Sequence, residues 1–252
     1  MADVLRIANC SGFYGDRLSA AREMVEGGPI DVLTGDYLAE LTLMILFRDR
    51  LKTPGAGYAR TFLRQMEEVL GTCVQKKIRI VVNAGGLNPA GLAAELEQLA
   101  TKLGIRARIA HVEGDDLLPR LAELQAKGVE LRHLDKGIPL AALDKQVVTA
   151  NAYLGAWGIV EALGRGADVV ICPRVTDAAL VVGPAAWRFQ WKPSSVRARA
   201  QWPSCARTSV RSNRARSSWV QTWANCWKLL AGCKKAKKSS PAGSSSSTPR
   251  HG

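Results

Sequence analysis

The carboxyl-terminal part of this 252-residue sequence has no acidic side chains. From Trp191 to Gly252 there are 13 Lys and Arg residues and no Asp or Glu, which leaves 22 basic and 22 acidic residues in the first 190. The whole formal charge of +13 therefore lies in this last segment. This division predicts a charge-balanced domain over residues 1–190 and a basic tail over residues 191–252.

The tail also has few aliphatic residues. It holds thirteen serines and five of the seven tryptophans, whereas residues 1–190 contain only two serines. Such a composition buries too little apolar surface to form a core, so we expect the tail to be disordered. Arg, Ser, Ala, Trp and Pro are common where a GC-rich coding region is read out of frame. We therefore interpret the tail as frameshift-derived and the domain before it as truncated.

Arg-rich stretches interleaved with Trp are also typical of surfaces that bind nucleic acid. A segment with this charge binds polyanions nonspecifically and with strong salt dependence. A basic-tailed protein that contacts nucleic acid or acidic partners is therefore the alternative to a protein that binds a small-molecule substrate. Removing residues 191–252 would abolish the binding of nucleic acid or acidic partners in the alternative, and it would leave the binding of a small molecule intact.

Long apolar runs and metal-binding patterns are absent as well. No stretch reaches the roughly 18 apolar residues of a membrane span, and no apolar run follows a basic segment at the amino terminus. The six cysteines show neither paired nor metal-binding spacing, so we expect reduced thiols in a cytoplasmic protein without membrane contact. The sequence identifies no metal and no cofactor, and homo-oligomerisation stays open.

Short runs rich in Val and Ile alternate with segments of helical period between residues 4 and 190. This alternation predicts an α/β fold with a mostly parallel sheet of about six strands and flanking helices. The expected strands are Val4–Asn9, Ile30–Thr34, Ile78–Asn83, Ala107–Val112, Val147–Ala150 and Asp168–Cys172.

The spacing of apolar residues and the capping residues predict the helices. One helix has Asn88 as its N-cap, Pro89 at its first position and a leucine stripe that begins at Leu92. The segment from Tyr37 to Phe47 is apolar nearly all round, so we expect a buried helix there. The other expected helices run from Tyr58 to Cys73, from Leu117 to Lys127 and from Thr176 to Trp187.

Four loops that follow predicted strands are rich in polar residues or glycine. In parallel sheets the loops at the carboxyl ends of strands meet ligands, and helix amino termini point there too. The four loops are Asn9–Gly15, Thr34–Tyr37, Asn83–Pro89 and Cys172–Asp177.

Three charged residues in these loops are the candidate catalytic residues. Arg174 can grip a carboxylate or phosphate with its forked donors, and Asp177, three residues later, can orient it or move a proton. A capping ion pair is the alternative for these two residues. Asp36 can act as a general acid or base, or as the N-cap of the helix that follows it.

The glycines and asparagines of these loops are candidates for ligand binding. The two glycine pairs allow a backbone to approach a phosphate, or they form tight turns between strand and helix. Neither pair completes a dinucleotide fingerprint, which disfavours a nicotinamide-dependent oxidoreductase. The asparagines can hold a carbonyl or hydroxyl group, or close a turn and cap a helix. The ligand-binding candidates are Ser11, Gly12, Asn83, Gly85, Gly86 and Asn88.

Cys10 and Cys172 follow predicted strands too. Each is either a nucleophile or a buried inert thiol, and none of the three histidines has a sequence relation to them that indicates pairing. We favour the inert thiol for both residues.

Five strings of this sequence, read in order, resemble the amino-terminal domain of the acyclic terpene utilisation (AtuA-like) family. They are SGFYGDRLSAA, TGDYLAELT, NAGGLNP, NAYLGAW and RVTDAALVVGPAAWRF. The resemblance covers residues 1 to about 189. It implies a role in the catabolism of branched acyclic terpenoids through coenzyme A thioesters, and hence a small anionic or acyl-CoA-type substrate. It does not name a reaction, so it does not decide whether the chain is an enzyme.

The sequence departs from the family pattern at two places. Pro173 stands where family members tend to have glycine, and proline has no backbone N–H to offer an anion. Family members continue past the last string with a charge-balanced, glycine-rich region, whereas here the tail begins. We therefore expect an incomplete or inactive fragment.

Overall fold

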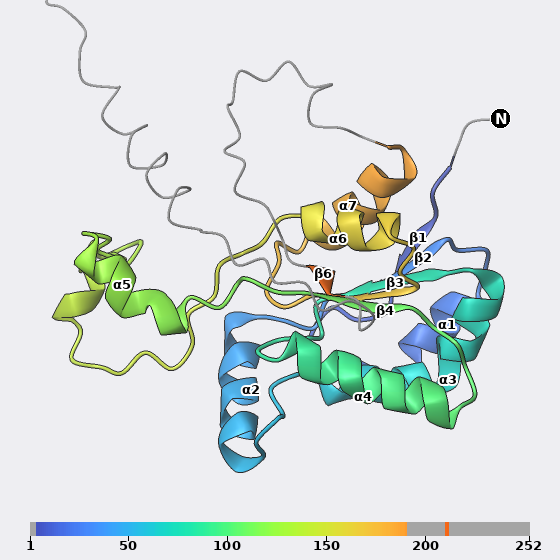
Figure 1. Ribbon diagram of the computed structural model, residues 1–252, viewed down its shortest axis with the longest axis horizontal. Coiled ribbons are helices and arrows are strands. Elements are labelled where there is room, and N and C mark those ends of the chain that lie inside the picture. Colours follow the sequence, from blue (N-terminus) through green and yellow to red (C-terminus); the bar gives the residue numbers. More distant parts are fainter. Residues whose placement is uncertain (1–3, 191–209, 212–252) are drawn as a thin grey trace, which may run out of the picture. The chain divides into compact units, whose positions relative to one another are not determined.

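The computed structural model describes residues 4–190 and 210–211. Within these residues five parallel strands form the sheet in the order β1-β2-β3-β5-β4, and the two-residue β6 pairs antiparallel with β4 (Figure 1). The α/β fold with a mostly parallel sheet is therefore confirmed. The strands are β1 Ile7–Asn9, β2 Val32–Gly35, β3 Arg79–Val82, β4 Ile109–Val112, β5 Val169–Ile171 and β6 Val210–Arg211.

The predicted number of parallel strands was one too high. Val147–Ala150 is not a strand, although its residues have high β propensity. The carbonyl oxygen of Ala150 accepts a hydrogen bond from the amide of Leu117 at 2.7 Å, in a loop outside the sheet. A strand needs a sheet edge to pair with, and β6 pairs with the outer edge of β4.

Helices cover both faces of the sheet. Figure 1 shows α1, α3 and α4 below the strands and α6 and α7 above them. Alternate residues of a strand face opposite layers. Ile80 and Val82 of β3 accordingly join the core cluster that contains the buried side chains of α3 and α4, while the equally buried Val81 lies outside that cluster. The helices are α1 Ala20–Glu26, α2 Glu40–Lys52, α3 Arg60–Lys76, α4 Pro89–Lys102, α5 Leu121–Ala126, α6 Trp157–Gly164 and α7 Ala179–Arg188.

The leucine-striped helix is confirmed as α4. The Asn88 side chain accepts a hydrogen bond from the amide of Gly91 at 2.9 Å, as an N-cap does, and Pro89 is the first helical residue. Leu92 and Leu96 are fully buried against the sheet. The helix predicted over 58–73 is α3, which begins two residues later because Tyr58 is in a bend and Ala59, the N-cap, has an extended backbone.

The predicted buried helix over residues 37–47 was wrong in its limits and in its burial. Helix α2 begins at Glu40, and Leu41, Met44 and Leu51 are exposed, Leu41 to 71%. Only one face of the helix packs on the domain, through Leu43 and Leu46. An apolar composition did not decide burial here, because one side of the helix has no neighbouring element among the described residues.

The remaining predicted helices are shorter than expected. The segment from Leu117 to Lys127 is a 3-10 turn, Leu118–Arg120, followed by α5, and another 3-10 turn spans Leu140–Ala142. The helix expected at Thr176 begins at Ala179 as α7. None of the described helices has the length and apolar character of a membrane span. The predicted disordered tail falls on residues outside the described ones, apart from the two residues of β6.

The strand order places a topological switch between β3 and β5. Helix α4 leads from β3 along one face of the sheet, and α7 follows β5 on the other face (Figure 1). The two connections diverge at the carboxyl ends of these neighbouring strands. In open α/β sheets, ligands bind in the crevice that this divergence leaves.

Candidate functional site

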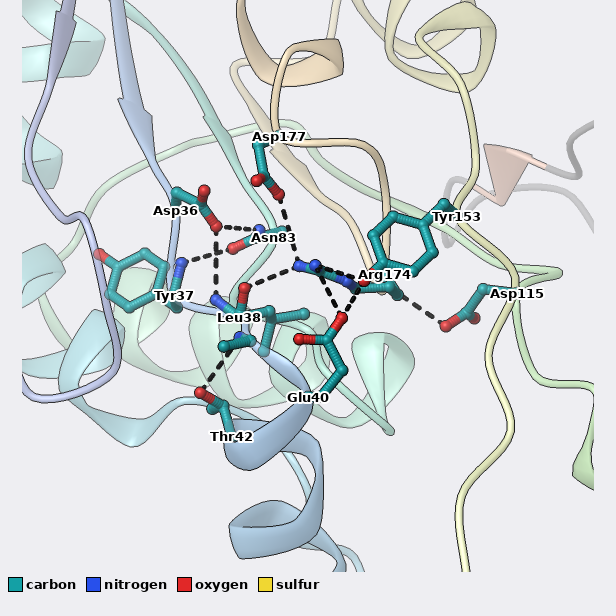
Figure 2. Close-up of polar contacts among 11 residues, drawn as sticks. Asp36, Tyr37, Leu38, Glu40, Thr42, Asn83, Asp115, Tyr153, Arg174 and Asp177 are labelled. Atoms are coloured by element: carbon teal, nitrogen blue, oxygen red, sulfur yellow. Dashed lines mark hydrogen bonds and ion pairs between the residues drawn. The ribbon is translucent and has the colours of Figure 1, made fainter. Parts of the chain in front are cut away.

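Polar residues from three strand ends meet at this switch point. Asp36 follows β2, Asn83 follows β3, and Arg174 with Asp177 follows β5 (Figure 2). The structure therefore brings together all three of the candidate catalytic residues and one of the ligand-binding candidates.

Arg174 is at the centre of this group and is only 4% exposed. Its Nη1 donates to the carbonyl oxygen of Leu38 at 2.7 Å and, more weakly, to Oδ1 of Asp177 at 3.5 Å. Asp177 is itself mostly exposed. The backbone carbonyl therefore fixes this end of the guanidinium, and the expected ion pair with Asp177 exists as a long contact.

The other end of the guanidinium contacts Tyr153 and Glu40. Nη2 of Arg174 donates to the Tyr153 hydroxyl at 2.9 Å, and Oε1 of Glu40 lies 3.6 Å from Nη2. The Tyr153 ring stacks on the guanidinium, 4.3 Å from Cζ to the ring centroid, and its hydroxyl donates to Glu40. Nε of Arg174 is buried and has no hydrogen-bond partner among the residues that the structure describes.

Asp115 binds the backbone of Arg174. One carboxylate oxygen of Asp115 accepts from the backbone amide of Arg174 at 3.2 Å and from Nδ2 of Asn151 at 2.7 Å. Asp115 is 5% exposed, and this burial raises the pKa of its carboxyl to about 6, although the two hydrogen bonds lower it. Oδ1 of Asn151 is a second buried polar atom without a partner.

Asn83 orients Asp36. Its Nδ2 donates to Asp36 at 2.6 Å, and its Oδ1 accepts from the amide of Tyr37 at 2.7 Å (Figure 2). Asp36 is not the N-cap of α2, because that helix starts at Glu40 and the amide of Ala39 bonds to Thr42 instead. Desolvation raises the pKa of Asp36, and the hydrogen bond from Asn83 opposes that rise.

The first glycine loop uses its polar groups internally. The Ser11 hydroxyl donates to the carbonyl oxygen of Phe13 at 3.0 Å, and the amide of Gly12 donates to Asp16 at 3.0 Å. The carbonyl oxygen of Ser11 accepts from the amide of Asp36 at 2.8 Å. Ser11 and Gly12 therefore shape the loop beside Asp36, and their donors already have partners.

The second glycine loop is closed in the same way. The amide of Gly85 donates to the carbonyl oxygen of Cys172 at 3.0 Å, and that of Gly86 donates to Asn83 at 3.3 Å. A Cβ on Gly85 would lie 2.7 Å from that carbonyl oxygen, so glycine allows two strand ends to approach. Asn88 caps α4 and donates to the carbonyl oxygen of Gly55 at 2.6 Å. These contacts favour tight turns over a phosphate cradle.

The cysteines at the strand ends are buried thiols. Burial raises the pKa of Cys10 to about 11 and moves the pKa of the fully buried Cys172 upward as well. Thiolate is therefore scarce at neutral pH, which favours inert thiols over nucleophiles. In the described part of the chain, no group of three or more His, Cys, Asp or Glu side chains is arranged to hold a metal ion.

Two cavities adjoin the Arg174 group. A cavity of about 150 Å³ is lined by Arg174, Tyr153, Glu40, Leu43, Thr149 and Asn151. A larger cavity of about 260 Å³ shares Thr149 and Asn151 with the first. The other lining residues of the larger cavity are mostly apolar: Phe47, Leu51, Leu87, Leu118 and Val148, with Arg50 and Asp116.

Four residues of the site were not among the sequence candidates: Glu40, Asp115, Asn151 and Tyr153. Asn151 and Tyr153 lie in the string NAYLGAW, so the family resemblance marked their segment without giving them a role. Glu40 lies in the string TGDYLAELT and was marked in the same way, whereas Asp115 lies in none of the five strings, and its position depends on how the 113–117 loop packs beside β5.

Comparison with known proteins agrees with the five strings. The sequence profile described as acyclic terpene utilisation family protein AtuA matches residues 5–202, which extends past the end near residue 189 predicted from the strings. No curated protein and no solved structure matches the chain. Because the profile covers most of the sequence, the chain belongs to the AtuA family of acyclic terpene utilisation proteins.

Proposed function

We propose that this AtuA-family chain serves acyclic terpenoid catabolism by binding an acyl compound, as a free acid or a coenzyme A thioester, at Arg174. The observation that carries this proposal is the buried Nε of Arg174, a donor in a cavity-lining side chain that has no partner. A buried donor without an acceptor costs about 1–3 kcal/mol, so a ligand oxygen that accepts from it gains that much.

The adjoining cavity supports a hydrocarbon substituent on that acyl group. Its walls are largely Phe47, Leu51, Leu87 and Val148, and it shares the lining residues Thr149 and Asn151 with the Arg174 cavity. Burying an aliphatic chain contributes about 25 cal/mol per Å² of apolar surface removed from water. The polar lining of the Arg174 cavity suits the acyl head of such a ligand, and the apolar lining of the larger cavity suits its branched chain.

Asp36 is the group that we assign to proton transfer. Its raised pKa brings the carboxyl closer to neutrality, and Asn83 fixes its orientation toward the Arg174 group. Asp177 is exposed, contacts Nη1 of Arg174 and is close enough to Asp36 to raise its pKa, so it is the second carboxylate available there. The nucleic-acid alternative concerns the tail, which lies outside the described residues, and it stays a prediction.

Calorimetric titration of the full chain with citronellic acid and with its coenzyme A thioester tests this function. We expect at least one of the two to bind, and we expect Arg174→Lys to weaken that binding about tenfold or more, because lysine lacks the forked donors. Arg165→Lys, on the exposed end of α6, is the matched control and should change nothing.

Absence of binding by both compounds would refute the proposal. So would an Arg174→Lys protein that is folded by circular dichroism and binds as tightly as the unsubstituted chain.

A further inference from the structure

The two edges of the Arg174 guanidinium are held in different ways. Nη1 is fixed by the carbonyl oxygen of Leu38 at 2.7 Å, which is part of the buried backbone. Nε and Nη2 share the other edge of the planar group, whose polar contacts within the described part of the chain are with the side chains of Tyr153 and Glu40. Tyr153 is 51% exposed and the Glu40 side chain 77% exposed. Nη1 is therefore held by the buried backbone. The Nε–Nη2 edge is covered by two side chains that are themselves exposed to solvent.

The covered edge has the geometry that a carboxylate prefers. Adjacent N–H groups of arginine bind the two oxygens of one carboxylate through parallel hydrogen bonds. Among the described residues that edge makes one hydrogen bond, from Nη2 to the Tyr153 hydroxyl, and Nε makes none. A ligand carboxylate would satisfy both donors, whereas a thioester carbonyl offers a single oxygen.

A ligand carboxylate at this edge would replace the charge of Glu40. Glu40 lies 3.6 Å from Nη2 and balances part of the guanidinium charge, and its pKa is lowered chiefly by the hydrogen bond from Tyr153. If the Glu40 side chain turns to solvent when a ligand carboxylate arrives, one negative charge replaces another. A neutral acyl group would displace the same carboxylate without restoring its charge.

The backbone around Tyr153 allows its side chain to move alone. The amide of Leu154 donates to the carbonyl oxygen of Arg174 at 3.2 Å, and the amide of Ala152 donates to that of Asp115 at 2.7 Å. These bonds hold the chain on either side of Tyr153 beside β5 and the 113–117 loop. A rotation of the tyrosine side chain therefore uncovers Arg174 without moving the backbone.

We propose that Tyr153 and Glu40 occupy the place of the ligand's carboxylate, and that the substrate class of this site is the free branched carboxylic acid. This inference rests on the proposed function, since it specifies which acyl compound Arg174 binds. Tyr153 and Glu40 are then specificity-determining residues: their side chains compete with the ligand for the Nε–Nη2 edge.

Calorimetric titrations of the full chain with citronellate, its methyl ester and its coenzyme A thioester test the inference. Citronellate should bind most tightly of the three. Glu40→Gln removes the competing charge and should tighten citronellate binding about tenfold. Tyr153→Phe removes the competing hydroxyl but keeps the stacked ring, and should tighten it by a smaller factor. The methyl ester should gain little from either change.

Glu67→Gln, an exposed acid on α3, is the charge-matched control and should leave all three affinities unchanged. Tighter binding of the thioester than of citronellate would overturn the inference while leaving the proposed function standing. Weaker citronellate binding by Glu40→Gln would also overturn it, because Glu40 would then be a partner of the ligand. Failure of every compound to bind would remove both proposals.

Discussion

The loops that follow β3 and β5 lie side by side at the switch point, yet they use their polar groups in opposite ways. In the β3 loop, residues 83–89, the amides of Gly85 and Gly86 and the side chain of Asn88 all bond within the protein. In the β5 loop, Arg174 is as deeply buried but leaves Nε without a partner. The β3 loop therefore shapes the site, whereas the β5 loop offers a donor to a ligand.

This difference could not be read from residue types. Glycine and asparagine at a strand end resemble a phosphate cradle in sequence, but here they allow close contact with the carbonyl oxygen of Cys172 and cap α4. Four substitutions test the distinction, in order of the free energy that we expect each to change.

The largest expected change in free energy of unfolding concerns Asp115, which binds the backbone of the β5 loop. Its pKa rises from 3.8 to about 6 on folding, so its protonated form favours the folded state. The stabilisation is full below pH 3.8 and is lost as pH rises through about 6, with a magnitude of about 3 kcal/mol. Asp115→Asn keeps an oxygen acceptor and does not titrate. Its unfolding free energy relative to the unsubstituted chain should therefore rise by most of that amount between pH 4 and pH 7.5, since the remainder of the loss falls below pH 4.

Urea unfolding at the two pH values measures this difference, and the comparison between variants cancels groups that titrate in both. A difference that does not change with pH would show that Asp115 is not buried as described.

Gly85→Ala should destabilise the fold by about 2 kcal/mol. The new Cβ would lie 2.7 Å from the carbonyl oxygen of Cys172 and 2.7 Å from Pro89, so the backbone must shift. Thermal unfolding measures the loss. Ligand affinity at a temperature where the variant is folded should be unchanged, and a loss of affinity there would place the β3 loop in the binding site.

Asn88→Ala should cost about 1 kcal/mol through the loss of the N-cap of α4. Asn88→Ser keeps an acceptor for the amide of Gly91 and should recover most of that stability. The denaturant midpoints of the two variants decide whether Asn88 acts as a helix cap or is available to a ligand. Equal midpoints would mean that the cap contributes little and would reopen a ligand-binding role for this side chain.

Asp177→Asn should change stability least, by about 0.5 kcal/mol. Its contact with Arg174 is 3.5 Å long and its side chain is 65% exposed, and exposed ion pairs contribute little. A loss of several kcal/mol in urea unfolding would mean that Asp177, and not the carbonyl oxygen of Leu38, holds Arg174 in place.

The fold followed from the sequence where local signals agreed with one another. The Asn88-Pro89 start and the leucine spacing after it defined α4, because capping and periodicity are both short-range properties. The Val- and Ile-rich runs of β2, β3 and β5 are buried on both faces, which is the environment that such runs predict. The run Val147–Ala150 is also rich in β-branched residues, but its backbone bonds to the loop at Leu117 and it is not a strand.

The α/β class, the family and the strand ends where polar residues gather could be predicted from composition and from patterns within a few residues. Which of these polar groups has no partner among the described residues depends on how distant segments pack together. Glu40 and Tyr153 are 113 residues apart and meet on Arg174 because α2 and the segment before α6 both pass the end of β5. Contacts between distant segments leave no periodic or local signal. The contacts of Glu40 and Tyr153 with Arg174 could therefore be found only from the three-dimensional structure.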